Sequence, residues 1–242
     1  MKKIVICGIT SAITTEVARL LSPGNQVVVA ARNSGSVEAI GKDLKLWGAK
    51  EVIPHVLDFT NLESVKIFKA KVEEELGALD LLFVSYGTLS DQERCQSDLD
   101  YAISEFQTNG LSQIALLQQF APMMSKGSTM AVVTSVAGDR GRGSNFYYGS
   151  AKGAVSIFLS GLRAEMSKMG IHVLDVRPGF VDTPMTAHVP KNFLFAKPEK
   201  VAKDIAWAIS RRRAVLYTPF FWKYIMCIIK ALPLFIFNRL KL

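Results

Sequence analysis

Three polar residues in the second half of the chain, Ser135, Tyr148 and Lys152, could carry out acid–base chemistry. Tyr148 and Lys152 are four positions apart, a spacing that places both side chains on one face of a helix, one turn apart. A lysine ammonium beside a phenol stabilises the phenolate and lowers the phenol pKa from its ordinary value of about 10. The pair therefore predicts a tyrosine that exchanges a proton with an alcohol or a ketone near neutral pH.

Ser135 follows residues 130–133, an apolar run that predicts a buried strand. Its hydroxyl is expected at the carboxyl end of that strand, where open α/β sheets bind ligands. A tyrosine and a lysine at this spacing are, on their own, more often part of an exposed helix face. The elements around the three residues must therefore decide whether they form a site.

Apolar runs and segments of helical periodicity alternate along the whole chain. This alternation predicts a parallel sheet with helices on both faces, a doubly wound Rossmann-type α/β fold. We find no internal repeat or second core, so residues 1–215 are predicted to form one domain, with an apolar and basic extension over residues 216–242. Strands are predicted at 2–7, 26–31, 51–57, 80–85, 130–134 and 172–176, and helices at 13–21, 37–47, 62–76, 99–124, 148–169 and 197–212.

The composition of the 242 residues is that of an ordinary globular chain. The three cysteines and three histidines are scattered, so neither a metal site nor a disulfide framework is predicted. Two lysines and a four-residue apolar run before Gly8 indicate a first strand rather than a secretory signal. We therefore expect a protein of the cytoplasm.

The net charge of +8 is concentrated at the end of the chain. Residues 197–242 contain ten basic and two acidic side chains, whereas residues 1–196 contain nineteen of each. Any attraction to an anionic partner therefore concerns the C-terminal part alone, and no nucleic-acid partner is predicted.

The turn after the first predicted strand has the position of a phosphate cradle. Residues 8–14 lead into the first helix, where backbone N–H groups and a helix N-terminus can face an anion. The turn is poor in glycine, because Ala12 and Thr14 occupy positions where such turns usually have glycine. The cofactor phosphates are expected against Gly8, Thr10, Ser11, Ala12 and Ile13.

Arg32 follows the second predicted strand. An acidic residue there would accept a hydrogen bond from a ribose 2′-hydroxyl, whereas an arginine suits a 2′-phosphate. Ser11 and Ser34 could add hydrogen bonds, so the sequence predicts NADP(H) over NAD(H); the alternative is a solvated arginine. Further contacts are expected after strands three and four, where Asp58 could accept from the adenine amino group and Phe59, Ser85, Tyr86 and Gly87 would line the adenosine and its ribose.

Taken in order, these features resemble the short-chain dehydrogenase/reductase family over roughly residues 3–215. Two positions depart from the family pattern: the turn at 8–14 lacks two glycines, and the turn at 85–87 lacks its usual asparagine. Both departures concern cofactor contacts and not the reaction. The matching positions are Gly8, Asp58, the turn 85–87, Asn109, Ser135, Tyr148 with Lys152, and Pro178 with Gly179.

The resemblance implies a role for each residue. Tyr148 would donate or accept the proton, Lys152 would lower its pKa and hold the nicotinamide ribose, and Ser135 would bond the substrate oxygen and stabilise the oxyanion. Asn109 would anchor a water and a backbone kink in a proton relay to Lys152. Without the resemblance, Asn109 is equally typical of a helix cap or a core amide, and Thr183 of a helix cap. Pro178, Gly179, Val181 and Thr183 would lie beside the nicotinamide.

Three segments, residues 87–98, 138–147 and 184–196, are expected to choose the substrate. In the second, Arg140 and Arg142 could meet a phosphate or carboxylate of the substrate, or could be exposed loop arginines. Residues 185–196, which include His188, are expected to form a lid over the pocket.

The C-terminal extension is aromatic, apolar and basic. Lys223, Lys230 and Pro233 interrupt it, so it is not predicted to span a membrane. Trp222, Tyr224 and the flanking basic residues are typical of a helix that lies in a membrane interface. The alternative is a subunit interface, since the resemblance implies a homo-oligomer, a dimer or a tetramer.

The extension, the stretch 86–92 and the turn 10–13 are also similar to a subgroup of the family, the decaprenylphosphoryl-2-keto-pentose reductase-like enzymes, which reduce a keto-sugar on a polyprenyl phosphate. The leading hypothesis is a ketoreductase that prefers NADPH and acts on a small or lipid-linked carbonyl substrate; peripheral contact with the inner face of the membrane is the expectation for the extension. The alternatives are a 3-oxoacyl-carrier-protein reductase-like enzyme, a generic alcohol dehydrogenase, or a non-catalytic nucleotide-sensing or scaffold protein. A scaffold, however, has no use for a tuned phenol.

Overall fold

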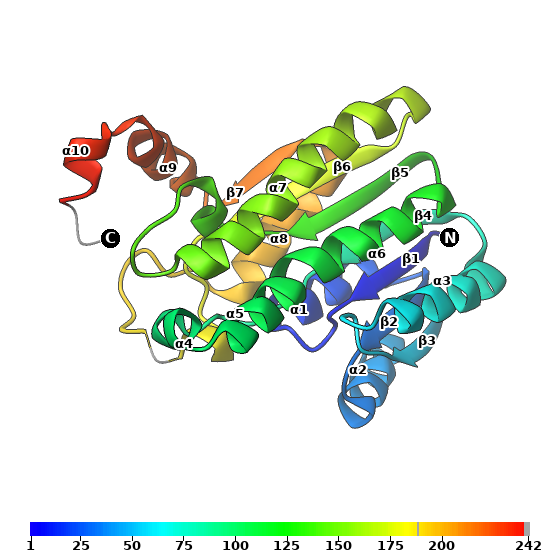
Figure 1. Cartoon of the computed structure of the whole chain (residues 1–242). Helices are drawn as coiled ribbons and strands as arrows, with labels where there is room; N and C mark the ends of the chain where they lie inside the picture. Colours follow the sequence, from blue (N-terminus) through cyan, green and yellow to red (C-terminus); the bar gives the residue numbers. More distant parts are fainter. Residues whose placement is uncertain (188, 240–242) are drawn as a thin grey trace.

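The computed structural model describes residues 1–187 and 189–239, and a parallel sheet of seven strands forms its centre (Figure 1). The strand order is β3-β2-β1-β4-β5-β6-β7, and every neighbouring pair is parallel. The chain starts in the middle of the sheet, builds outwards to β3, and then crosses back to β4 on the other side of β1. The predicted doubly wound α/β fold is therefore confirmed, and the strand order reverses between β1 and β4.

The first half of the chain alternates strand and helix as predicted, with boundaries within three residues of the expected ones. Its helices α2 and α3 begin at asparagine caps, since Asn33 and Asn61 accept from the backbone N–H groups of Ser36 and Ser64. The elements are β1 (Lys3–Cys7), α1 (Ala12–Leu21), β2 (Gln26–Ala31), α2 (Ser34–Leu46), β3 (Glu51–Val56), α3 (Leu62–Leu76) and β4 (Leu79–Val84).

The second half departs from the predicted elements in several places. The helix expected over 99–124 is interrupted by a π-helical segment, η1, and its last residue belongs to β5. Helix α4 and strand β7 were not predicted. Strand β5 starts six residues before its predicted start, because the first half of the strand is polar and gave no apolar run to predict it from. The elements are α4 (Gln92–Ser97), α5 (Leu99–Phe106), η1 (Gln107–Leu111), α6 (Ser112–Phe120), β5 (Met124–Val133), η3 (Val136–Asp139), α7 (Phe146–Met166), β6 (His172–Pro178), η5 (Pro184–Thr186), α8 (Pro198–Ser210), β7 (Val215–Thr218), α9 (Trp222–Ala231) and α10 (Leu234–Phe237), with short 3₁₀ turns at Ala121–Met123 and Ser167–Met169.

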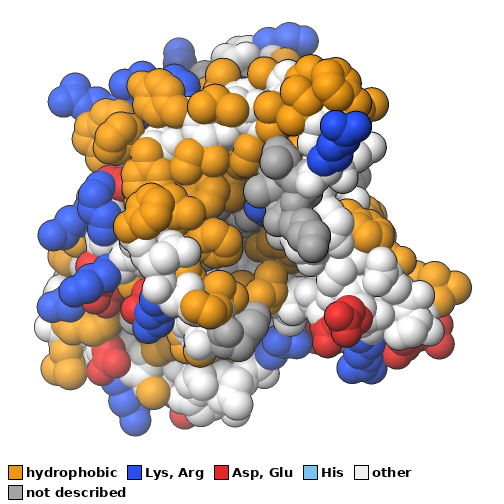
Figure 2. Space-filling model, turned by 90° about the vertical axis from the view of Figure 1, so that its left-hand side faces the viewer, with side chains coloured by type: hydrophobic (Ala, Val, Ile, Leu, Met, Phe, Trp, Pro, Cys, Tyr) orange, Lys and Arg blue, Asp and Glu red, His pale blue; other side chains and the backbone are white. Residues whose placement is uncertain are grey.

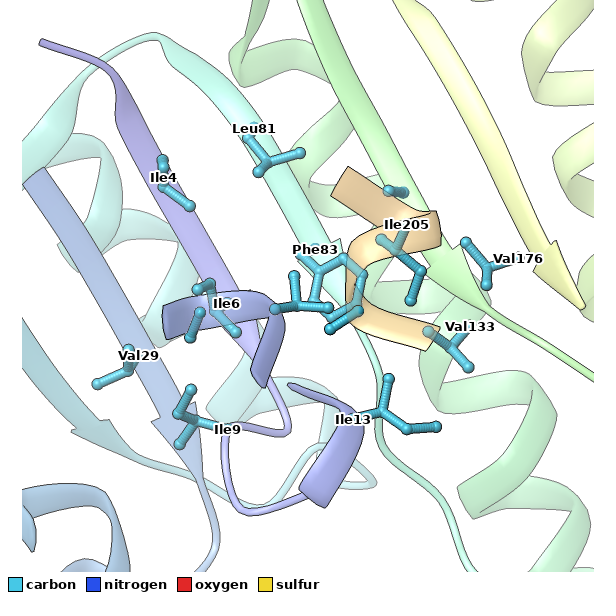
Figure 3. Close-up of a cluster of buried hydrophobic side chains, with 14 of the residues drawn as sticks. Ile4, Ile6, Ile9, Ile13, Val29, Leu81, Phe83, Val133, Val176 and Ile205 are labelled. Carbon is cyan, nitrogen blue, oxygen red and sulfur yellow. The ribbon is translucent and has the colours of Figure 1, made fainter. Parts of the chain in front are cut away.

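Two hydrophobic layers lie on the two faces of the sheet. Successive side chains of a strand point to opposite faces, so the central strands are apolar at nearly every position. In β1, Ile4 and Ile6 pack against α1 and α8 on one face, where Ile13 and Ile205 meet Phe83 of β4 (Figure 3). Val5 and Cys7 face the other layer, formed with α3, α6 and α7. Burial on both faces fixes the strand ends, and therefore the residues that follow them.

Strand β7 extends the sheet beyond the predicted limit of 215 and carries the chain to α9 and α10. These two helices lie apart from the sheet, beyond its β7 edge and near the carboxyl ends of the strands (Figure 1). Helix α9 nevertheless packs on the protein through a third apolar cluster, in which Trp222 and Met226 are buried against Val136. The last three residues of the extension, 240–242, and His188 lie outside the described residues.

Candidate active site

One cavity of about 390 Å³ opens at the carboxyl ends of the strands. This is the edge where ligands bind in open α/β sheets, and the reversal of strand order between β1 and β4 adds to the opening. Every predicted cofactor-binding residue except Ser34 lies on its wall, together with Ser135, Tyr148 and Lys152 of the predicted catalytic set. The wall includes Gly8, Thr10, Ser11, Ala12, Ile13, Arg32, Asp58, Phe59, Ser85, Tyr86, Gly87, Pro178, Gly179, Val181 and Thr183.

The turn after β1 is shaped by contacts with the end of β4. Gly8 has a φ of +89°, and a Cβ atom there would overlap the carbonyl oxygen of Ser85. Thr14 is fully buried and donates its hydroxyl hydrogen to the same oxygen at 3.3 Å. The Thr14 side chain thus bonds the first turn of α1 to the end of β4, at a position where such turns usually have a glycine that allows close packing. The result is a narrow turn beside a helix N-terminus, a shape that fits a dinucleotide phosphate.

The nucleotide end of the cavity contains one acid and a pair of stacked rings. Asp58 accepts hydrogen bonds from the backbone and the hydroxyl of Thr60, at 2.9 and 2.7 Å. These bonds, and to a smaller extent the charge of Arg32, hold the pKa of Asp58 below its ordinary value. The rings of Phe59 and Tyr86 stack in parallel, with their centres 4.2 Å apart. Asp58 is therefore an anionic acceptor beside a flat apolar wall, as an adenine would require.

Ser135, at the end of β5, is brought to Tyr148 by the close approach of η3 to helix α7. A Cβ at Gly138 would lie 2.7 Å from the backbone nitrogen of Gly153, and one at Gly149 would lie 2.8 Å from the carbonyl oxygen of Ala137. Side chains at these positions would push the two segments apart. The Ser135 hydroxyl accepts from Ala137 N at 3.1 Å and also bonds the Tyr148 phenol.

The Tyr148 pKa differs in direction from the expectation. Burial raises it to about 12, and the bond with Ser135 lowers it only in part. The Lys152 ammonium lies 6.0 Å from the centre of the Tyr148 ring and donates to Val133 O at 3.4 Å. Burial also lowers the Lys152 pKa to about 7, although Asp175 opposes this shift. Desolvation is thus the largest cause of both pKa shifts, and Tyr148 holds its proton at neutral pH.

Asn109 is the predicted catalytic residue that does not reach the cavity wall. It is fully buried in η1, where Oδ1 accepts from Thr88 N at 2.9 Å and Nδ2 donates to Glu105 at 3.2 Å. Gly87 separates it from the cavity, since a Cβ at Gly87 would overlap Asn109 Oδ1 and lie 3.5 Å from Lys152 Nζ. The expected backbone kink coincides with the π-helical segment, which begins two residues before Asn109.

Trp222 is a cavity residue that the sequence interpretation placed in a membrane-seeking tail. Its indole is 3% exposed, and a Cβ at Gly179 would overlap it. Phe180 meets the indole edge-on, with ring centres 5.6 Å apart. Helix α9 therefore supports the loop after β6. No local signal in the sequence could have shown this, because the contact joins residues more than forty positions apart.

The two arginines of the 138–147 segment have different environments. Arg140 donates to the backbone carbonyls of Ile229 and Leu232 at the end of α9, and its guanidinium lies 3.8 Å from the ring centre of Phe237. Arg142 lies on the cavity wall. The predicted lid also contributes to this wall through Met185 and Val189.

The described part of the chain has neither a membrane-spanning helix nor a cluster of metal-ligating side chains. None of its helices is long and apolar enough to cross a membrane. No group of three or more His, Cys, Asp or Glu side chains within residues 1–187 and 189–239 could hold a metal ion.

Comparison with known proteins gives a family and several relatives. The family model described as short chain dehydrogenase matches residues 2–193. An uncharacterized oxidoreductase of Mycobacterium tuberculosis is 32% identical over 240 residues, which cover 98% of this chain and 96% of the relative. Another from Streptomyces coelicolor is 32% identical over 99% of this chain and 96% of its own length. An NADP-dependent 3-hydroxy acid dehydrogenase of Schizosaccharomyces pombe is 28% identical over 89% of each chain.

Proposed function

This chain belongs to the short-chain dehydrogenase/reductase family and is an NAD(P)-dependent oxidoreductase, and we propose that it reduces a ketone to a secondary alcohol with NADPH. The observation that carries the proposal is the shared cavity wall: a nucleotide cradle, Ser135, Tyr148 and Lys152 all face one space. The runner-up, a non-catalytic nucleotide sensor, would not need a buried phenol bonded to a serine in that space.

The residues present fit a dinucleotide cofactor. Gly8 leaves room at the β1 turn that a Cβ would fill, and Asp58 presents an acceptor at the adenosine end. Pro178, Gly179 and Val181 line the opposite part of the wall, where they would hold the nicotinamide. When bound, the reduced cofactor supplies a hydride to the carbonyl carbon.

The preference for NADPH is proposed from Arg32 and the start of α2. Arg32 lies on the cavity wall at the end of β2, and no acid occupies that position. Helix α2 begins two residues later, so its free backbone N–H groups add partial positive charge near the same place. A ribose 2′-phosphate would meet both. The relative from Schizosaccharomyces pombe, an NADP-dependent enzyme, agrees with this preference.

The proton steps follow from the groups at the centre. Tyr148 is protonated at neutral pH and can give its proton to the substrate oxygen as the alcohol forms. Ser135, bonded to the phenol, can donate to the same oxygen and stabilise the negative charge that develops on it. Lys152 would hold the cofactor ribose and, when charged, stabilise the phenolate left behind. Asn109 would act from behind Gly87 as a positioning residue.

Replacing Tyr148 with phenylalanine tests the proposal. NADPH consumption with a panel of ketones is expected to fall by about 10²- to 10⁴-fold, because the proton donor is lost while the ring is kept. Tyr147→Phe is the matched control: Tyr147 is the adjacent residue on α7 and is not part of the cavity wall. Equal turnover by wild type and Tyr148→Phe would refute the catalytic assignment.

We also propose that the enzyme works at a membrane surface, on a lipid-linked ketone such as a keto-sugar. Support comes from the α9–α10 surface, which we define as Phe220, Tyr224, Ile228, Leu234, Phe235 and Ile236, all of them exposed. Figure 2 shows hydrophobic side chains gathered on the face that contains these helices, with Lys and Arg at its edges. An apolar surface bordered by cations suits an anionic bilayer.

Vesicle sedimentation tests this second proposal. Wild type is expected to sediment with phosphatidylglycerol-containing vesicles, and a Leu234→Ser/Phe235→Ser variant is expected to remain in solution. Both substitutions are on α10, so the sheet and Trp222 stay intact. Light scattering of the same variant tests the alternative, a subunit interface. If wild type does not sediment with vesicles and the variant loses its oligomeric state, the surface is a subunit interface.

A further inference from the structure

We propose that Arg142 is the recognition site for an anionic group of the substrate, so that the natural ketone carries a carboxylate or a phosphate. The inference rests on the proposed ketone reduction and adds the chemical class of the substrate. It starts from a cation on the cavity wall that the described residues leave without a partner.

Among the residues that the structure describes, none forms an ion pair with Arg142. Its Nε is buried without a hydrogen-bond partner among the described residues. None of the ion pairs in residues 1–187 and 189–239 involves it. Burial lowers the pKa of its guanidinium, and no acid opposes this shift. An arginine stays charged in proteins, and this half-buried charge has no opposite charge beside it among the described residues, so an anion would complete this site.

The wall around Arg142 is otherwise mostly apolar. Leu89, Val136, Met185, Val189 and Trp222 face the same cavity. Three of the unpartnered buried polar atoms in the described chain belong to cavity residues: Arg142 Nε, Asn145 Oδ1 and Trp222 Nε1. Two are donors and one is an acceptor. The terminal guanidinium nitrogens of Arg142 are not among these shielded atoms, so they are the atoms that can meet an anionic group of the substrate.

The position of Arg142 separates it from the cofactor phosphates. It belongs to the loop between Ser135 and Tyr148, the two residues proposed to act on the ketone. The phosphate cradle and Arg32 belong to β1, α1 and β2, in the other half of the sheet. Arg142 is therefore placed to meet the substrate and not the nucleotide.

Both flanks of the loop are anchored, so the arginine is held at the site. On one side, the buried Asp139 accepts from Arg177 and from the Tyr217 hydroxyl, both at 2.7 Å. On the other side, the backbone N–H of Asn145 donates to the carbonyl oxygen of Arg142 at 3.1 Å. The guanidinium, with donors in a planar fork, can bind either a carboxylate or a phosphate in a bidentate manner.

Paired substrates that differ only in charge test the inference. Acetoacetate with methyl acetoacetate forms the carboxylate pair, and dihydroxyacetone phosphate with dihydroxyacetone forms the phosphate pair. Arg142→Met is expected to raise KM for the preferred anionic ketone by about 10- to 100-fold and to change KM for its neutral partner by less than about threefold. Arg142→Lys should restore part of the loss. The pair that shows the effect identifies the source of the anion.

The controls separate this inference from the proposed function. Arg211→Met removes an exposed arginine after α8, at the opposite edge of the sheet, and should change neither KM. NADPH affinity, measured by fluorescence, should be the same in wild type and Arg142→Met. Equal losses on charged and neutral ketones would overturn the inference while leaving ketone reduction in place.

A wild type that reduces none of these ketones would contradict the proposed function alone. A binding measurement then tests the inference without turnover. Calorimetric titration of acetoacetate and of inorganic phosphate into the NADP⁺-loaded enzyme should show weaker binding to Arg142→Met than to wild type. Equal binding of both anions to the two proteins would overturn the inference.

Discussion

The nucleotide end and the substrate end of the cavity are built in different ways. The nucleotide end uses the turn after β1 and the residues after β2, β3 and β4, all within the first 90 residues. The substrate end combines the loop after β5, Met185 and Val189 from the segment after β6, and Trp222 from α9, which come from distant parts of the chain. The difference teaches that a cofactor site can be inferred from local pattern, whereas a substrate site requires the tertiary structure.

Trp222 gives the largest expected effect at the substrate end. Trp222→Ala removes a buried indole and should lower the free energy of unfolding by about 3–5 kcal/mol. Urea unfolding measures this loss, and NADPH affinity should fall as well, because Trp222 packs on Gly179, which is proposed to hold the nicotinamide. An unfolding curve equal to that of wild type would show that α9 does not support the site.

Gly179 provides a matched partner for that experiment. Gly179→Ala places a methyl group against the Trp222 indole and should cost about 1–3 kcal/mol through overpacking. In the double variant the clash is absent, so its stability should be close to that of Trp222→Ala alone. Strict additivity of the two losses would contradict the contact.

Arg32 gives the corresponding test of the nucleotide end. Arg32→Ala should weaken NADPH binding by about 10- to 100-fold, the loss expected for a charge-assisted hydrogen bond, with little effect on NADH. Titration of both reduced cofactors against wild type and variant measures the difference. Equal losses for the two cofactors would refute a contact with the 2′-phosphate.

The pH dependence of ketone reduction should report on Tyr148 and Lys152, which lie between the nucleotide end and the substrate end of the cavity. Burial lowers the Lys152 pKa from 10.5 to about 7, so Lys152 is charged below pH 7 and neutral above it. The charged form stabilises the phenolate that remains after Tyr148 gives up its proton. We therefore expect kcat/KM for reduction to fall as the pH rises through about 7. A flat profile from pH 6 to 9 would contradict this assignment.

The sequence was sufficient for the fold and for the residues that follow strand ends. Gly8, Arg32, Asp58 and Ser135 could be placed because an apolar run predicts where each strand ends, and in a parallel sheet those ends share one edge. Two interpretations of Arg142 stayed open, a substrate contact and an exposed loop arginine, because nothing in the local sequence distinguishes Arg142 from Arg140.

What could not be predicted depends on burial and on long-range contacts. The Tyr148 pKa was expected to be lowered by Lys152, but desolvation of both groups reverses the direction. Strand β7 was missed because only four residues form it, and its partner β6 is more than thirty residues earlier. The packing of Trp222 on Gly179 exists only once β7 has brought α9 to the cavity.

The most direct test of the account follows deuterium from C4 of the reduced nicotinamide during a single turnover with a ketone. We expect wild type to form an alcohol with deuterium on the carbinol carbon. Tyr148→Phe should bind NADPH with unchanged affinity and transfer the label at least about 100-fold more slowly. Transfer at the wild-type rate by Tyr148→Phe, or an alcohol without the label, would contradict the assignment of Tyr148 as the proton donor in NADPH-dependent ketone reduction.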